Sequence, residues 1–144
     1  FYPFILMMKK PAILLFILLL TSQFILAQQL DTVKDSLVLS LQQADSLSEF
    51  LPIVYSNKGC GRCVTAENFL QSNGIDFIHL SLALEENRII MYQVATGQAA
   101  KTNISILYPV IIYKKEVYYG QTPLQEYLES LREKIRLQET SHTN

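Results

Sequence analysis

The strongest constraint on this chain is a pair of cysteines, Cys60 and Cys63, which are the only cysteines in the sequence. A strand-like apolar run at residues 51–55 precedes the pair, and a helix-like run at residues 64–72 follows it. A strand, a short loop, Cys-x-x-Cys and a helix, in that order, are typical of a site where two thiols form and break a disulfide. The pattern therefore predicts a dithiol site at the start of a helix.

This placement also favours a reactive sulfur at Cys60. A cysteine at a helix N-terminus meets backbone N–H groups without helical partners and the positive end of the helix dipole, and both stabilise a thiolate. Cys63 follows one turn later on the same side and can close a disulfide onto Cys60. Because the loop closed by such a disulfide is very small, it would stabilise the fold little. We therefore interpret the pair as catalytic rather than as a structural cross-link.

Length and composition limit the other possibilities. A chain of 144 residues with a formal charge of −1 suits one small domain, and it carries no basic surface that would indicate a nucleic-acid partner. No second pair of cysteines or histidines lies near Cys60 and Cys63 to complete a zinc site. We expect a monomer that holds no metal and no bound cofactor.

The N-terminal residues 1–27 are interpreted as upstream residues and a secretory signal. Lys9 and Lys10 precede an apolar run at residues 12–20, and a cleavage point is expected after Ala27. The alternative is an uncleaved membrane anchor, although the apolar part is shorter than the roughly 20 residues that span a bilayer. Cleavage predicts a secreted or periplasmic protein, in a compartment where disulfides persist.

The rest of the chain is predicted to contain a linker at residues 28–39, one domain at 40–136 and a polar tail at 137–144. Within the domain, helical and strand patterns alternate. Helices are expected at 40–50, 64–72, 84–95 and from 123 onward, and strands at 51–55, 75–82, 104–113 and 117–119. This order predicts an α/β domain in which a β-α-β unit and a hairpin share one sheet, with helices on both faces.

Four segments resemble the thioredoxin-fold family and, within it, the glutaredoxins. They are residues 54–63, residues 95–98, Tyr108-Pro109-Val110 and residues 117–120, and the resemblance covers residues 40–135. It implies a thioredoxin fold, with a mixed four-stranded sheet built from β-α-β and β-β-α units. It also implies a thiol–disulfide oxidoreductase in which Cys60 attacks a disulfide and Cys63 resolves the mixed disulfide that forms.

The resemblance further implies three substrate-binding positions, Tyr108, Pro109 and Gly120. The Tyr108–Pro109 peptide would be cis and the backbone of Tyr108 would pair with an extended substrate segment. Glutaredoxins hold glutathione with a double glycine and an acidic pair, where this chain has Gly-Gln-Thr-Pro at 120–123. A protein disulfide or another small thiol is therefore at least as good a candidate substrate as glutathione.

Two cations beside Cys60, Lys58 and Arg62, are candidates for tuning its reactivity, because a nearby positive charge lowers the pKa of a thiol. The alternative is that both are solvated surface charges. For His79, within a predicted strand, a structural role is favoured over a catalytic one.

A second class of function stays open alongside the enzyme. The same scaffold could serve as a binding module for a protein partner, a metal ion or an iron–sulfur centre, without redox turnover. For the enzyme, the direction of the reaction depends on the reduction potential and on the partner that resets the cysteines.

Overall fold

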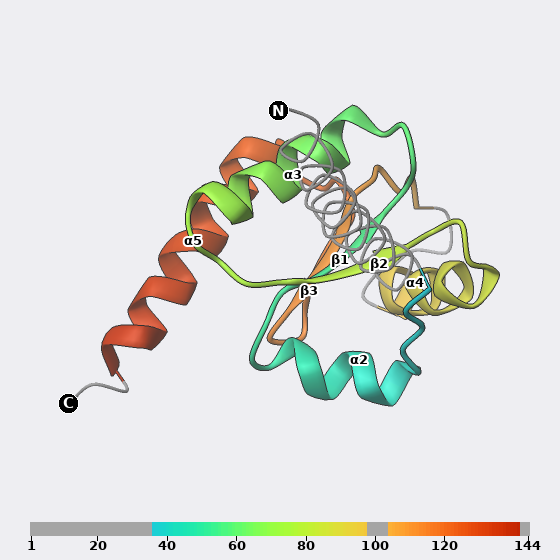
Figure 1. The fold of residues 1–144 in the computed structure, drawn as a ribbon, viewed down its shortest axis with the longest axis horizontal. Helices are drawn as coiled ribbons and strands as arrows, with labels where there is room; N and C mark the ends of the chain where they lie inside the picture. Colours follow the sequence, from blue (N-terminus) through green and yellow to red (C-terminus); the bar gives the residue numbers. More distant parts are fainter. Residues whose placement is uncertain (1–35, 98–103, 142–144) are drawn as a thin grey trace, which may run out of the picture. The chain divides into compact units, whose positions relative to one another are not determined.

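The computed structural model describes residues 36–97 and 104–141, which all belong to the second of the two units into which the chain divides, residues 36–144. The predicted signal and the first part of the predicted linker lie outside the described residues. The elements are α2 (Leu41–Ser48), β1 (Ile53–Ser56), α3 (Gly61–Ser72), β2 (Ile78–Ser81), α4 (Glu85–Gly97), β3 (Val110–Tyr113), β4 (Glu116–Tyr118) and α5 (Leu124–Ser141) (Figure 1). The expected order of helices and strands is confirmed.

The four strands form one mixed sheet in the order β2-β1-β3-β4. β1 runs parallel to β2 and antiparallel to β3, and β4 pairs antiparallel with β3. Tyr55 in β1 therefore lies between Leu80 of β2 and Val110 of β3. β1 occupies an inner position, and its C-terminal end leads directly into the loop that carries the cysteines.

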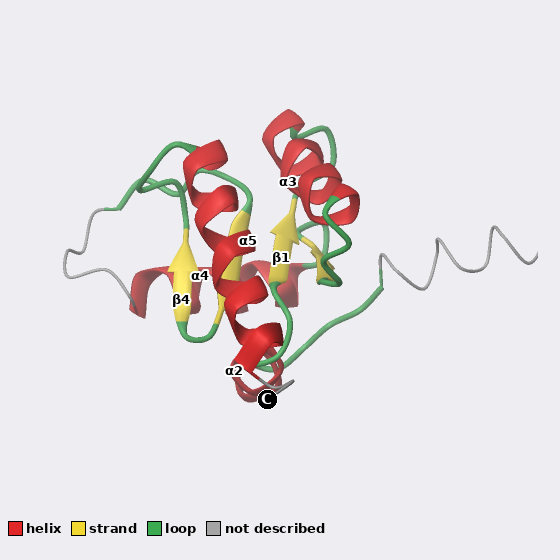
Figure 2. Ribbon diagram, turned by 90° about the vertical axis from the view of Figure 1, so that its left-hand side faces the viewer, coloured by secondary structure: helices red, strands yellow, loops and turns green. Residues whose placement is uncertain are grey.

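Helices cover both faces of the sheet (Figure 2). Alternate residues of β1 point to opposite faces. Ile53 and Tyr55 pack in a cluster with residues of α2 and α4, whereas Val54 packs in a cluster with residues of α3 and α5. All residues of β1 and β3 are buried, as expected for inner strands covered on both sides. The predicted α/β architecture is confirmed.

Local sequence explains where two of the helices begin or end. Ser40 caps α2, since its hydroxyl accepts from the Gln43 N–H and the Gln43 side chain accepts from the Ser40 N–H. After α3, Gly74 adopts a positive φ of 68°, and the Ile75 N–H bonds to the Leu70 carbonyl. This left-handed glycine stops the helix and turns the chain toward β2.

Several predicted boundaries differ from the observed ones, and β2 begins at Ile78 rather than at residue 75. The strand expected at residues 104–113 begins only at Val110, because residues 104–109 form a loop that ends in Pro109, which has no N–H to give to a sheet. Helix α5 continues to Ser141, so residues 137–141 are helical instead of forming a tail. The Tyr113 hydroxyl donates to the side chain of Gln138 at 2.7 Å and anchors this last part of α5 to the sheet.

None of the helices in residues 36–97 and 104–141 is long and apolar enough to cross a membrane.

Candidate redox site

The turn after β1 places Cys60 at the start of α3. Gly59 adopts a positive φ of 79°, and the Cys60 N–H closes the turn on the Asn57 carbonyl at 3.1 Å. Cys60 is the N-cap of α3, and its sulfur accepts a hydrogen bond from the Cys63 backbone N–H at 3.2 Å. The helix begins at Gly61, three residues earlier than predicted, because the Cys60 sulfur itself supplies the cap.

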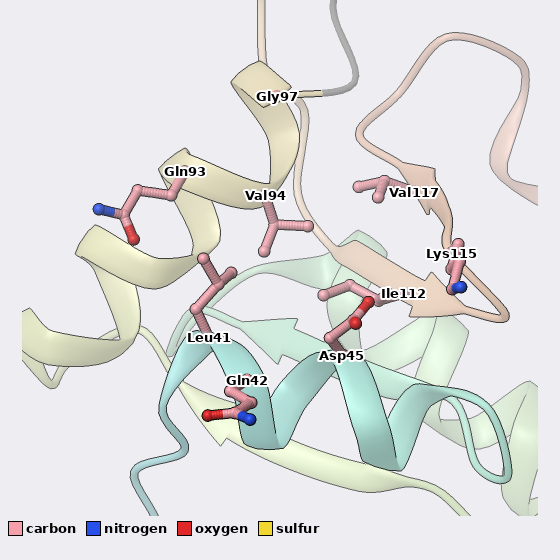
Figure 3. A pocket seen from close by; sticks show the side chains of 9 residues that line it. All are labelled: Leu41, Gln42, Asp45, Gln93, Val94, Gly97, Ile112, Lys115 and Val117. Carbon is pink, nitrogen blue, oxygen red and sulfur yellow. The ribbon is translucent and has the colours of Figure 1, made fainter.

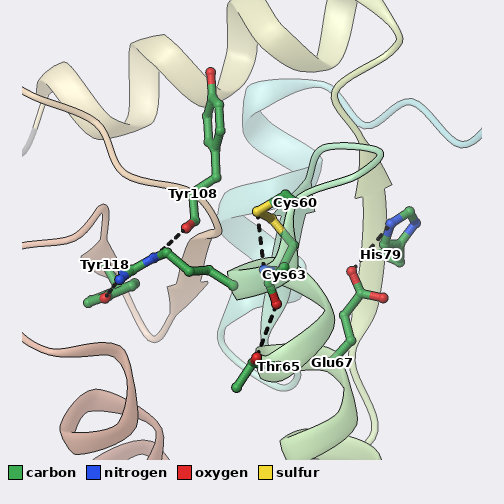
Figure 4. Close-up of a disulfide and its surroundings, with 9 residues drawn as sticks. Cys60, Cys63, Thr65, Glu67, His79, Tyr108 and Tyr118 are labelled. Atoms are coloured by element: carbon green, nitrogen blue, oxygen red, sulfur yellow. Dashed lines mark hydrogen bonds and ion pairs between the residues drawn. A yellow bond between two sulfur atoms is a disulfide. The ribbon is translucent and has the colours of Figure 1, made fainter.

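Cys60 and Cys63 are joined by a disulfide, with their Cα atoms 5.3 Å apart (Figure 4). Cys60 is partly exposed, whereas Cys63 is fully buried. Cys60 is therefore the more accessible of the two residues. The geometry suits a pair in which one sulfur meets an external molecule and the other closes the disulfide from inside.

The Tyr108–Pro109 peptide is cis, as the sequence led us to expect. The loop before it is held by a hydrogen bond from the Leu107 N–H to the Tyr119 carbonyl at 2.9 Å. Gly120 has a φ of 99°, and a Cβ at this position would lie 2.6 Å from the Cβ of Leu107. Glycine is therefore required at position 120 for this close approach, which keeps the loop at residues 107–109 against the end of β4.

Arg62 connects the cysteine-bearing helix to this loop. Its Nε donates to the Tyr108 carbonyl at 3.0 Å, and its Nη2 donates to the Tyr118 hydroxyl at 2.9 Å, along the dashed lines that reach Tyr108 and Tyr118 in Figure 4. The Tyr118 hydroxyl in turn donates to the Thr122 carbonyl at 3.0 Å, and its ring stacks on Tyr127. Among the predicted site residues, Arg62 thus brings Tyr108 and the cysteines together.

The sequence does not indicate these contacts, because the charges next to Cys60 suggest only a thiolate partner or a solvated side chain for Arg62. The acceptors lie 46 and 56 positions away, so no local pattern could have indicated them. Lys58, the second predicted tuning residue, is exposed in the turn before Cys60 and makes no ion pair with a described carboxylate.

The phenol of Tyr108 extends the site toward α4. In Figure 4 its ring points toward that helix, where Tyr92 and Arg88 lie. Burial first, and then the neighbouring Tyr92 hydroxyl, raise the pKa of Tyr108, whereas the positive charge of Arg88 acts in the opposite direction. The side of the site away from α3 is therefore lined by an aromatic pair and a cation.

His79 lies outside this network. Its Nε2 is 3.6 Å from Glu67 Oε1, and the pair links β2 to α3 (Figure 4). The contact agrees with the structural role expected for His79. Within the described residues, no group of three or more His, Cys, Asp or Glu side chains is arranged to hold a metal ion.

A cavity of about 550 Å³ lies apart from the cysteines, between α2, α4 and the β3–β4 hairpin (Figure 3). Leu41, Val94 and Ile112 supply apolar side chains to it, and Asp45 and Lys115 stand at its polar side. None of the predicted site residues lines this cavity.

No protein-family model matches the chain, and comparisons with curated proteins and with solved structures found no match.

Proposed function

We propose that this protein is a thiol–disulfide oxidoreductase of the thioredoxin fold, similar to the glutaredoxins, in which Cys60 is the nucleophile and Cys63 the resolving thiol. One observation carries the proposal. A partly exposed cysteine that caps a helix is joined by a disulfide to a fully buried cysteine in the first turn of the same helix. This difference in exposure assigns different roles to the two sulfurs.

The topology supports the thioredoxin fold. The parallel β1–β2 pair and the antiparallel β3–β4 hairpin share one sheet in the order β2-β1-β3-β4. The cis Tyr108–Pro109 peptide precedes β3 and is tied to the cysteine-bearing helix by Arg62. The mixed sheet and the cis proline are features that the resemblance in the sequence implies for the family, whereas the contact of Arg62 is a feature of this chain.

The local geometry explains how Cys60 could react. When the disulfide is reduced, the Cys63 N–H and the positive end of the α3 dipole favour a thiolate at Cys60. This thiolate attacks one sulfur of a substrate disulfide, and the other substrate sulfur leaves as a thiolate that takes a proton from solvent. A mixed disulfide between Cys60 and the substrate results.

Cys63 completes the exchange. Its thiolate attacks the Cys60 sulfur, so that the Cys60–Cys63 disulfide forms and the substrate is released as a second thiol. Two electrons and two protons pass to the substrate in total. The reverse sequence oxidises a dithiol, and the direction follows from the reduction potential and from the partner that resets the pair.

Substrate positioning is assigned to Tyr108, Pro109 and Gly120. An extended segment would pair with the backbone of Tyr108, whose carbonyl oxygen already accepts from Arg62 and has a second lone pair. Protein disulfides and small-thiol disulfides, glutathione included, are the proposed substrates, and no bound cofactor is needed. The predicted signal would place this activity in the periplasm or outside the cell.

The proposal is tested by the redox equilibrium of the purified full chain. It is equilibrated in glutathione buffers, its thiols are trapped by alkylation, and the mass is measured. We expect a reversible two-electron transition that is lost in Cys60→Ser and Cys63→Ser. A midpoint near about −270 mV would indicate a reductant and one near about −120 mV an oxidant. A disulfide that does not equilibrate, or a co-purifying metal ion, would support the binding module instead.

A further inference from the structure

Two cations flank Cys60 in the sequence and a third lies near Tyr108, and none of them has an acidic partner among the described residues. Lys58 and Arg62 lie two positions before and after Cys60, and both are exposed. Arg88 lies near the phenol of Tyr108. None of the three forms an ion pair with a carboxylate in residues 36–97 and 104–141. The site therefore carries positive charge that the described part of the chain does not neutralise.

Most other described cations are neutralised. Ion pairs join Lys115 to Glu49, Lys134 to Glu116, and Arg132 and Arg136 to glutamates of α5. The remaining one, Lys114, lies over the ring of Tyr113, at the hairpin turn. Since the whole sequence has a formal charge of −1, the unneutralised cations around Cys60 are a local feature.

Arg62 is oriented to bind an anion. Its Nε–H and one Nη2–H bond to Tyr108 and Tyr118, which fixes the plane of the guanidinium. Both N–H groups of Nη1 and one of Nη2 have no partner among the described residues. Two nitrogens at the tip of a guanidinium match the two oxygens of a carboxylate. The side chain is thus held in place by protein contacts while its tip stays available.

The tip of the Arg62 guanidinium lies beside the proposed substrate-binding position, which indicates the kind of ligand that it could bind. Tyr108, which accepts from Arg62, is the residue proposed to pair with an extended substrate. Large apolar side chains beside it are exposed, with Leu107 at 49% and Tyr92 at 48%. A segment bound there would contact apolar surface and would pass the cations on either side of Cys60.

We propose that the site selects protein substrates in which an Asp or Glu lies within two residues of the reacting cysteine. The carboxylate binds the free tip of Arg62, and the exposed charge of Lys58, in the turn before Cys60, adds longer-range attraction. This inference rests on the proposed function, because it names the substrate class of the same cysteines. The exchange itself is the thiol–disulfide reaction described above and needs no further reactant.

The test compares two synthetic peptides that contain the same disulfide and differ only by Glu or Gln beside the reacting cysteine. With a thiol reductant in excess to restore the Cys60 and Cys63 thiols after each exchange, and with the uncatalysed rate subtracted, the full chain should reduce the Glu peptide with a kcat/KM about fivefold to tenfold higher, which is the effect of one charge-assisted contact at a partly exposed site. The difference should lie in KM. It should also shrink as salt rises, since exposed charges are screened.

Variants then assign the preference to particular residues. In Arg62→Gln the kcat/KM for the Glu peptide, divided by that for the Gln peptide, should fall toward one, whatever happens to the absolute rates. Arg62→Lys should restore part of this ratio. Lys58→Gln should lower the ratio without removing any hydrogen bond of the fold. Arg136→Gln is the matched control, because this exposed arginine of α5 makes no contact with the site, and its ratio should equal that of the wild type.

The outcomes separate the two proposals. Equal rates on both peptides in the wild type would overturn the acidic-substrate inference and leave the proposed function standing. A preference that survives in Arg62→Gln would also overturn it, since the carboxylate would then bind elsewhere. If the wild type turns over neither peptide and shows no redox equilibrium, the proposed function fails and the inference fails with it.

Discussion

Arg62 Nε donates a hydrogen bond of 3.0 Å to the carbonyl oxygen of Tyr108, although 46 positions separate the two residues. The same guanidinium donates to the hydroxyl of Tyr118, and the ring of Tyr118 stacks on the ring of Tyr127 in α5. One side chain from between the two cysteines therefore contacts both the loop before β3 and strand β4. These two bonds join the helix that begins at the cysteines to the cis-proline loop and to β4.

We expect Arg62→Gln to lower the free energy of unfolding by about 1–2 kcal/mol, because two hydrogen bonds at partly exposed groups are lost. The measurement is urea denaturation of the oxidised full chain, with the disulfide intact in both proteins. Arg136→Gln changes the same residue type at an exposed position of α5 and should stay within about 0.5 kcal/mol of the wild type.

A double-mutant cycle between Arg62→Gln and Tyr118→Phe should give a coupling of about 0.5–1 kcal/mol, since the two side chains bond directly. Each single variant and the pair are compared by the same denaturation. Strict additivity of the two effects would contradict a direct interaction between Arg62 and Tyr118.

Gly120→Ala should destabilise the fold by about 2 kcal/mol or more. Its φ of 99° is unfavourable for any residue with a Cβ, and the new methyl would lie 2.6 Å from the Cβ of Leu107. Gly97→Ala, in α4, is the control, because it has no positive φ and its Cβ would meet no atom of the described residues within 4 Å. Thermal denaturation compares the two; similar losses of stability would contradict the account of Gly120.

The arrangement of elements could be predicted because burial leaves a periodic pattern in the sequence. The continuous apolar run of β1 records a strand buried on both faces, and the spacing of Leu124, Leu128 and Leu131 in α5 records the face of that helix that meets the core. The beginning of β3 could not be predicted in this way. Residues 104–109 include Ile104, Ile106 and Leu107, which resemble a strand, but the segment is a loop that ends in Pro109 and packs Leu107 against Gly120, a contact that forms only in the folded chain.

In the candidate site, too, local features could be predicted from the sequence and long-range contacts could not. The position of Cys60 at a helix N-terminus and the less exposed position of Cys63 follow from a local motif, whereas the cis peptide before Pro109 is implied only by the family resemblance. The hydrogen bonds of Arg62 depend on two acceptors that only the folded sheet brings near, so the sequence supported two other interpretations equally well. A charged residue next to a cysteine in the sequence does not show in which direction its side chain points.

The two thiols should differ strongly in reactivity once reduced. Cys60 is partly exposed and Cys63 is fully buried, so iodoacetamide should modify Cys60 at least about tenfold faster than Cys63 under native conditions. Mass spectrometry after brief labelling and proteolysis gives the two rates. Equal labelling in the native state, rather than only in urea, would contradict the assignment of Cys60 as the sulfur that meets the substrate.

Tyr55 should make the fold sensitive to alkaline pH. Its hydroxyl is buried beneath α2 and α4, has no hydrogen-bond partner among the described residues, and burial raises its pKa to about 12. An unfolded tyrosine ionises near about pH 10. Below that pH both states keep the proton. Between pH 10 and 12 the unfolded state loses it first, so the free energy of unfolding should fall by up to about 2–3 kcal/mol.

Tyr55→Phe isolates this contribution. Tyr127, whose pKa is also raised by burial, is present in both proteins and cancels in the comparison. The variant should therefore lose less stability between pH 9 and 12 than the wild type does, as followed by urea denaturation at each pH. At pH 7 it should be as stable as the wild type or more stable by up to about 1 kcal/mol, because a buried hydroxyl without a partner is removed. Parallel pH profiles for the two proteins would show instead that the Tyr55 hydroxyl reaches solvent or a hydrogen-bond acceptor in the folded state.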